Sequence, residues 1–274
     1  MNGQCGITLQ RARGDAMLAA RMDRGRTRLC GLRQRGSAKI LLPRNHRDAA
    51  LEAVFLNTAG GMTGGDRFTW TIEAGADTQM RVTSQAAERV YRAASDTAVV
   101  STQLRICARA RLEWLPQETI LFDGARLERL LDIEVHPGAT LLAVESIVLG
   151  RRAHGEQARS GSLVDRWRVH RDGRPILVET LRLNGLLQAL MSSATGNGAA
   201  ATATVLLVAP DAEQRIDAIR AMLPEGPGLE AGASAFRGMV LVRMLATNGD
   251  RLRPDLAALL ARLGDGPLPR VWQA

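Results

Sequence analysis

The sequence is poor in cysteine, aromatic residues and lysine, and these shortages exclude several classes of protein. Its three cysteines, Cys5, Cys30 and Cys107, are widely spaced and form no CxxC pair, which indicates a reducing compartment rather than a disulfide framework. Aromatic residues make up 3% of the chain, too few for the base stacking that usually holds single-stranded nucleic acids. No apolar run approaches the roughly 18 residues that span a bilayer. We therefore expect a cytoplasmic protein that binds neither a membrane nor a nucleic acid.

Almost all of the positive charge is arginine, and its excess is confined to one segment. Hydrophobic residues (46%) and charged residues (23%) occur in ordinary globular proportions, so the chain can bury a core. The formal net charge is +8, but residues 11–47 carry eleven cations against Asp15 and Asp23, a local +9 that leaves −1 for the remainder. This basic segment predicts a docking surface for an acidic partner. Nucleic-acid binding through the same segment, with a steep salt dependence, is an alternative.

Period-two alternation of apolar and polar residues predicts a fold dominated by β-sheet. Asp172-Gly173, between two such runs, predicts a type I′ hairpin, because both residue types tolerate positive φ. Gly75-Ala76-Asp77 predicts a turn. The strand candidates are residues 51–56, 68–73, 79–83, 99–108, 126–135, 140–149, 163–170, 175–183, 204–208 and 238–245.

Helical spacing appears only late in the chain. Apolar residues after Pro210 predict a helix that ends at Pro224, and a leucine face after Pro254 predicts a second helix closed by Gly264. The segment 185–202 is rich in Gly, Ser, Ala and Thr, so we expect a long loop with one helical turn at its apolar start. The two late helices either cover the core or contribute to a partner interface.

The residues alone show no recognisable active site. The glycine-rich segment 57–66 lacks the Lys-Ser/Thr of a P-loop, so it predicts a tight chain reversal in which glycines allow positive φ or close backbone approach. The four histidines have no metal-ligand spacing, which excludes a closed metal site of standard pattern but not a path of weak ligands. A hydrolase using Asp66, Glu118 or Asp123 as paired carboxylates is an alternative without a motif. The glycines of the segment 57–66 are Gly60, Gly61, Gly64 and Gly65.

Several segments, in order, resemble the urease accessory protein D family (UreD, or UreH in some organisms). NTAGGMTGGDR at residues 57–67 resembles that family's NTAGG-x-TGGDR, and TSQAAERVYR at 83–92 resembles its TTQAAEKVYR, with Ser84 where the family often has threonine. LEWLPQETILFDGA at 112–125 matches almost letter for letter. Gly150-Arg151 with Gly155-Glu156, and the ending at residues 269–272, complete the order.

The resemblance implies a cytoplasmic maturation factor that is not an enzyme. Members of the family act as scaffolds between apo-urease subunits and two accessory proteins, UreF and the GTPase UreG, while nickel is delivered to urease. It also implies one domain over residues 1–274, with residues 1–14 as a flexible tail, within a hetero-oligomer. The expected fold is an elongated, mostly β scaffold of stacked sheets resembling a β-helix, with a few helices near the C-terminus. No cofactor would be bound permanently: Ni²⁺ would pass transiently, and UreG would hold the GTP.

Four carboxylates are the candidates for a transient nickel path through such a protein. Asp66 and Glu88 lie in the matched segments, whereas Glu145 and Glu179 interrupt apolar strands. A lone carboxylate in such a strand must face solvent or be compensated inside the protein. The alternative for Glu145 and Glu179 is therefore a wet strand face or a pair with one of the many arginines, because unpaired carboxylates are rarely buried.

Overall fold

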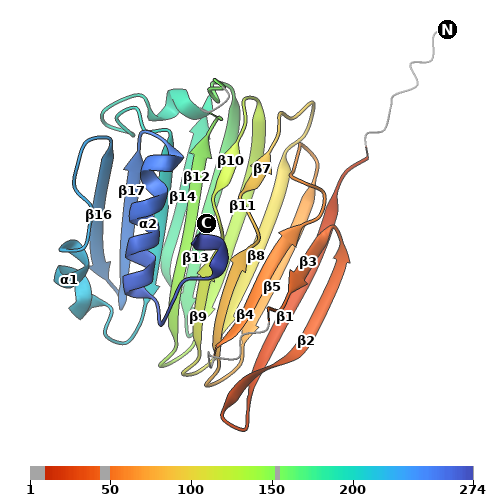
Figure 1. Cartoon of the computed structure of the whole chain (residues 1–274), viewed down its shortest axis with the longest axis vertical. Helices are drawn as coiled ribbons and strands as arrows, with labels where there is room; N and C mark the ends of the chain where they lie inside the picture. The colour runs from red at the N-terminus through yellow and green to blue at the C-terminus, as the bar shows by residue number, and fades with distance from the viewer. Residues whose placement is uncertain (1–9, 44–49, 152–154, 274) are drawn as a thin grey trace.

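Alternating buried and exposed side chains place most of the chain in two stacked β-sheets (Figure 1). The computed structural model describes residues 10–43, 50–151 and 155–273. The seven-stranded sheet has the order β14 (Arg174–Asn184), β13 (Gly161–Arg171), β11 (Ala125–Val135), β8 (Ala98–Ile106), β5 (Arg67–Ala74), β1 (Arg13–Asp23) and β2 (Arg26–Gly36). The ten-stranded sheet has the order β16 (Leu229–Phe236), β17 (Met239–Ala246), β15 (Ala201–Val208), β12 (Thr140–Leu149), β9 (Arg111–Leu115), β6 (Gln79–Ser84), β4 (Leu51–Asn57) and β3 (Ala38–Leu41). Two short strands, β10 (Thr119–Leu121) and β7 (Glu88–Val90), continue from β12 in that sheet.

The chain winds from one sheet to the other and back, so the strands of each sheet stack in parallel. β5, β8, β11 and β13 form one parallel series, and β4, β6, β9 and β12 form the other. The turn at residues 75–77 therefore connects the two sheets instead of closing a hairpin within one. This winding confirms the expected scaffold of stacked sheets resembling a β-helix.

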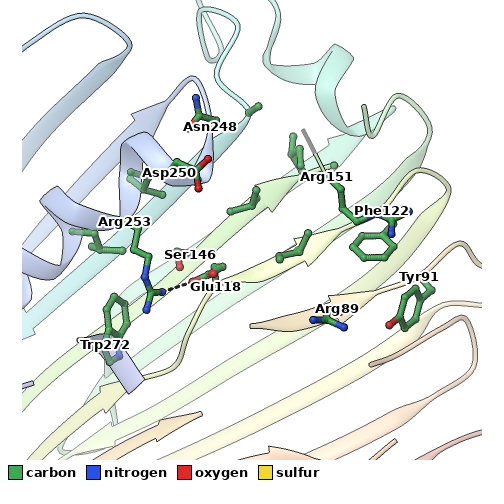
Figure 2. Close-up of a pocket in the computed structure, with 18 residues that line it drawn as sticks. Arg89, Tyr91, Glu118, Phe122, Ser146, Arg151, Asn248, Asp250, Arg253 and Trp272 are labelled. Carbon is green, nitrogen blue, oxygen red and sulfur yellow. Dashed lines mark hydrogen bonds and ion pairs between the residues drawn. The ribbon is translucent and has the colours of Figure 1, made fainter. Parts of the chain in front are cut away.

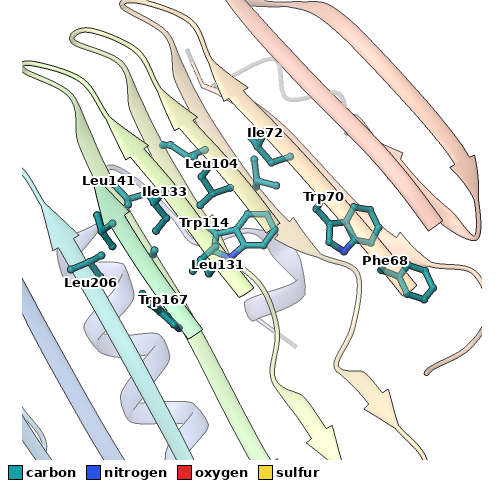
Figure 3. Close-up of a cluster of buried hydrophobic side chains, with 14 of the residues drawn as sticks. Phe68, Trp70, Ile72, Leu104, Trp114, Leu131, Ile133, Leu141, Trp167 and Leu206 are labelled. Atoms are coloured by element: carbon teal, nitrogen blue, oxygen red, sulfur yellow. The ribbon is translucent and has the colours of Figure 1, made fainter. Parts of the chain in front are cut away.

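The main core lies between the two sheets, where inward side chains of both series meet (Figure 3). Phe55 of β4 packs against Trp70 of β5 and stacks on Trp114 of β9, with ring centroids 4.8 and 4.9 Å apart. Fully burying each such side chain stabilises the fold by roughly 1.5–3 kcal/mol. Three of the four tryptophans, Trp70, Trp114 and Trp167, thus lie in this main core.

A second apolar cluster holds α2 (Gly249–Leu263) on the outer face of the ten-stranded sheet (Figure 1). The expected leucine face is buried, but the expected start after Pro254 is wrong: the helix begins earlier because Asn248 Oδ1 accepts a hydrogen bond from Arg251 N at 2.9 Å. Gly264 has φ −78°, so the helix ends without a left-handed glycine. Glu113 instead accepts a hydrogen bond from Asp265 N at 2.7 Å and fixes the end of the helix.

The other expected elements are largely confirmed. Asp172 (φ 52°) and Gly173 (φ 73°) form the type I′ turn between β13 and β14. The helix after Pro210 is shorter than expected, with η3 (Glu213–Arg215) followed by α1 (Ile216–Arg220). The single turn after Gly185 is η2 (Leu186–Leu190), and η4 (Arg270–Trp272) lies near the C-terminus. No helix of the described residues is long and apolar enough to cross a membrane.

The basic segment forms a β-hairpin, β1 and β2, followed by β3, none of which was expected from the sequence. β1 already contains Arg13 and the buried Gly14, so the tail expected at residues 1–14 stops before them; residues 1–9 lie outside the described residues. Cys30 and Cys107 are free thiols, in line with the absence of a disulfide framework, whereas Cys5 is outside the described residues.

Candidate functional site

A cavity of about 280 Å³ lies inside the sandwich, between strands of both sheets. The glycine-rich segment and the short strand β7 form one side of it, and β9, β11 and β12 form another. Its walls combine aromatic rings with a few charged and amide side chains. Among the residues that line it are Phe55, Asn57, Trp70, Glu88, Trp114, Arg129 and Glu145.

Glu88 is a carboxylate of this cavity whose pKa is raised toward neutral pH. Asn57 Nδ2 donates a hydrogen bond to Glu88 Oε1 at 3.3 Å. Burial raises the pKa of Glu88 to about 7, the nearby charge of Asp66 adds to the rise, and the hydrogen bonds from Asn57 and the Arg89 backbone oppose it. Glu88 can therefore exchange a proton near neutral pH.

Asp66 has a structural role in the segment that closes this side of the cavity. Its two carboxylate oxygens accept hydrogen bonds from Ala12 N and Thr63 N, both at 2.8 Å. The side chain is buried and does not line the cavity. Asp66 thus ties the glycine-rich turn to the chain before β1 and affects the cavity through its charge on Glu88.

The glycines of this turn are required by conformation at one position and by space at another. Gly61 has φ 136°, and a Cβ there would lie 2.4 Å from the Tyr91 ring. A Cβ on Gly64 would lie 2.0 Å from the carbonyl oxygen of Ser95. The expectation of positive φ or close backbone approach is therefore confirmed at these positions.

Glu145 lies at the far wall of the cavity, clamped by a buried arginine. Arg129 Nη1 is 2.5 Å from Glu145 Oε2, and its Nε and Nη2 donate to the two Asp165 oxygens at 3.0 and 2.6 Å. Trp114 Nε1 donates to the other Glu145 oxygen at 3.1 Å. Burial raises the pKa of Glu145, while the Arg129 charge opposes that rise. With one cation and two carboxylates, the cluster carries net negative charge when all three groups are ionised.

A second cavity, of about 200 Å³, lies on the other side of this cluster and shares Glu145 in its wall. Glu179 of β14 also lines it and pairs with Arg243, whose Nη2 is 2.6 Å from Glu179 Oε1. Three threonines and Asp165 also line it. The threonines are Thr195, Thr202 and Thr204.

The structure thus brings three of the four expected carboxylates to two neighbouring cavities and leaves Asp66 outside both. Pairing with arginine, the alternative for Glu145 and Glu179, is confirmed for both. Glu145 and Glu179 can line the cavities and pair with arginine at the same time. The clamp of Arg129 and Asp165 was missed, although both residues occupy inward positions of alternating strands.

The carboxylates of the hydrolase alternative each have separate partners. Asp66 is held by backbone N–H groups, and Glu118 pairs with Arg253 Nη1 at 2.9 Å. Hydrogen bonds from Ser160 hold the pKa of Asp123 below its ordinary value. Within the described residues, no group of three or more His, Cys, Asp or Glu side chains is placed to hold a metal ion.

A groove of about 440 Å³ lies on the outer face of the ten-stranded sheet, beside α2 (Figure 2). The guanidinium carbon of Arg151 lies 4.3 Å from the ring centroid of Phe122, and the Tyr91 ring meets Phe122 edge-on at 5.0 Å. On the helix side, Arg253 pairs with Glu118 and lies over the Trp272 ring. The segments 83–92 and 112–125, which carry the resemblance, both contribute to this groove.

Comparison with known proteins decides the family. A family model described as "UreD urease accessory protein" matches residues 12–273. The chain belongs to the UreD family of urease accessory proteins. It is 46% identical to "Urease accessory protein UreD" of Chelativorans sp. (strain BNC1), over 96% of this chain and 95% of the relative. It is 46% identical to the protein of that name from Rhizobium leguminosarum bv. trifolii (strain WSM2304), over 99% of both chains. For that of Rhizobium rhizogenes (strain K84 / ATCC BAA-868), the identity is 48% over 96% of both. The resemblance seen in the sequence is thereby confirmed, and urease maturation is the process in which this UreD-family chain takes part.

Proposed function

We propose that this chain is a non-enzymatic, cytoplasmic scaffold that joins apo-urease to UreF and UreG and gives Ni²⁺ an internal path to urease. The observation that carries the path is the pair of cavities inside the sandwich, which share Glu145 and are lined by Glu88 on one side and Glu179 on the other. In this proposal the path passes Glu88, Glu145 and Glu179 one after the other. GTP would be bound by UreG and not by this chain.

The chemistry of the walls suits passage of Ni²⁺ better than storage. A path for a hydrated cation needs oxygen or imidazole donors that replace part of the hydration shell and are too few to trap the ion. The second cavity offers carboxylate and threonine oxygens. Arg129 competes with any cation for Glu145 and Asp165, so these two carboxylates cannot become a tight metal site.

The groove beside α2 is the proposed contact with the accessory partner UreF. It is formed by residues of the family segments at 83–92, 112–125 and 150–151 together with α2 and Trp272. Aromatic and arginine side chains, which are enriched at protein interfaces, both line this groove. Figure 2 shows Arg151, Phe122 and Tyr91 on one side of the groove and Arg253 and Trp272 on the other.

The test of the path is nickel loading of urease co-expressed with UreF, UreG and variants of this chain. Glu88→Gln and Glu179→Gln, alone and together, are expected to lower nickel per urease active site while the accessory complex still co-purifies. Glu73→Gln, on the outer face of β5, is the matched control, because Glu73 lines neither inner cavity. Wild-type nickel content in the double variant would refute the path. Unchanged urease activation without this chain would refute the maturation role itself.

Asp66 is expected to behave differently in the same assay. Asp66→Ala removes the acceptor of two backbone hydrogen bonds to a charged group, each worth about 1.5–3 kcal/mol. We expect it to lower the amount of folded protein, and nickel loading only in proportion. Asp66→Asn retains one acceptor oxygen and should lose less. A folded Asp66→Ala variant that assembles fully and fails only in nickel loading would place Asp66 on the path instead.

A further inference from the structure

The edge of the seven-stranded sheet at β2 is a basic surface that no described strand covers and that the proposed nickel path does not use (Figure 1). β2 is the terminal strand and pairs with β1 alone among the described strands. Thr27 is its only buried residue. In an antiparallel pair, alternate residues of an edge strand direct their N–H and C=O groups outward, so β2 offers a template for one more strand.

The outer face of β2 carries a row of arginines. Arg28 is paired in register with Arg21, and Arg33 with Met17, which places both on the face opposite the buried Leu18. Arg33 is 3.1 Å from Asp15. The remaining arginines of the row form no ion pair with any residue in the described part of the chain; they are Arg26, Arg28 and Arg35.

The inner face of the same strand is apolar and only partly covered. Leu29 and Leu32 lie opposite the buried Ala20 and Leu18, yet their exposed fractions are 39% and 40%. The ten-stranded sheet forms hydrogen bonds with side chains of β2 near the two ends of that strand. Gln79 N of β6 donates to Thr27 Oγ1, and Ile40 N of β3 donates to Gln34 Oε1, each at 2.9 Å. Between these contacts the leucines face solvent.

These features select among possible occupants. A second copy of β2 would place one arginine row beside another, and like charges opposed across strands are destabilising. A nucleic acid would have no ring to stack on, because β1 and β2 contain no aromatic residue. The opposite edge strand, β14, carries Pro175, which removes a backbone donor, whereas β2 has no proline.

We propose that β2 binds an extended, acidic segment of a partner protein, which adds to the sheet as an eighth strand. Acidic side chains on one face of that segment would pair with the arginine row. Apolar side chains on its other face would cover Leu29 and Leu32. The segment therefore alternates acidic and apolar residues. This surface is independent of the nickel path, so its failure would leave the path untouched.

The experiment uses the full chain and a fluorescent peptide of about ten residues, the length of β2, in which glutamate alternates with valine and threonine. Binding is followed by fluorescence anisotropy, and strand addition by hydrogen exchange of the β2 amides. A glutamine version of the peptide is the ligand control. The variant R26E/R28E/R35E is compared with R105E/R126E/R168E, which makes the same charge change at exposed positions of interior strands of this sheet. Circular dichroism checks folding, and R26Q/R28Q/R35Q replaces the first variant if it fails to fold.

We expect the glutamate peptide to bind and to protect the β2 amides. The glutamine peptide and the β2 variant should each weaken binding by about tenfold or more, and the interior variant by less than about threefold. Absence of binding, equal loss in the two arginine variants, or unprotected β2 amides would overturn the proposal. Tighter binding of a single-stranded oligonucleotide of equal charge would overturn it in favour of nucleic acid.

Discussion

Glu88 links the cavity to the stability of the protein, and the link can be measured. In the unfolded chain its carboxyl has an ordinary pKa of 4.5, whereas burial raises the pKa of the folded carboxyl to about 7. Between these values the folded state keeps a proton that the unfolded state has released. Stability must therefore fall as the pH rises through this window, by about 1.4 kcal/mol per pH unit and roughly 3 kcal/mol in all. Above the folded pKa the loss is complete.

Glu88→Gln removes this dependence without changing the size of the side chain. Glutamine stays neutral, and its amide oxygen can still accept the hydrogen bond from Asn57 Nδ2. At the acid end of the window the variant and the wild type should have similar stability. Near pH 8 the variant should be more stable by roughly 3 kcal/mol, because the wild type then holds a buried carboxylate.

The assay is urea unfolding followed by tryptophan fluorescence at a series of pH values from about 4.5 to 8, across the window set by the two pKa values. The quantity compared is the difference in unfolding free energy between Glu88→Gln and wild type at each pH. Glu73→Gln, on the outer face of β5, controls for the loss of one carboxylate outside the cavities. A difference that does not change with pH would refute the assignment of a raised pKa to Glu88.

Two further predictions concern the clamp and the glycine-rich turn. Arg129→Met should lower the unfolding free energy by about 3–5 kcal/mol, because it leaves Glu145 and Asp165 buried without a cation. Adding Glu145→Gln and Asp165→Asn to this variant should restore part of the lost free energy. Urea unfolding measures both changes. Gly64→Ala should strongly reduce the amount of soluble protein, because its Cβ would lie 2.0 Å from the carbonyl oxygen of Ser95. Gly60→Ala, with φ 77° and open space around the new Cβ, should lower the unfolding free energy by only about 1–2 kcal/mol. Equal thermal stability of the two variants would contradict this prediction.

Much of the sheet architecture could be predicted from alternation alone. Ten strands lie within a few residues of their expected bounds, and several of them alternate between a buried face and a more exposed one, for example β5 and β11. β2 was missed because only Thr27 of its eleven residues is buried, so burial leaves no period-two pattern. The strands β7 and β10 were missed because each has three residues. The expected start of α2 is wrong because the helix is capped at Asn248, and Pro254 lies inside it.

The site could be predicted in part, and the missing part was a pairing between strands. Glu88, Glu145 and Glu179 were identified, but the arginine partners of Glu145 and Glu179 could not be assigned without the register. Arg129 and Asp165 occupy apolar positions in their strands, between Leu127 and Leu131 and before Trp167. Two residues of opposite charge, each at an inward position of its strand, indicate a buried ion pair. That they meet depends on the parallel register of β11 and β13, which joins residues far apart in the sequence.

The basic edge strand β2 and the Glu179 end of the proposed nickel path lie at opposite ends of the seven-stranded sheet, and the distance between them decides whether their charges interact. β2 and β14 are six strand spacings apart in the seven-stranded sheet, roughly 29 Å at about 4.8 Å per spacing. Exposed charges are largely screened beyond about 8 Å at physiological ionic strength. The arginines of β2 therefore neither repel a cation at Glu179 nor compensate its charge, which falls to Arg243 at 2.6 Å. Reversal of the edge charges should consequently change partner binding without changing what Ni²⁺ meets at Glu179.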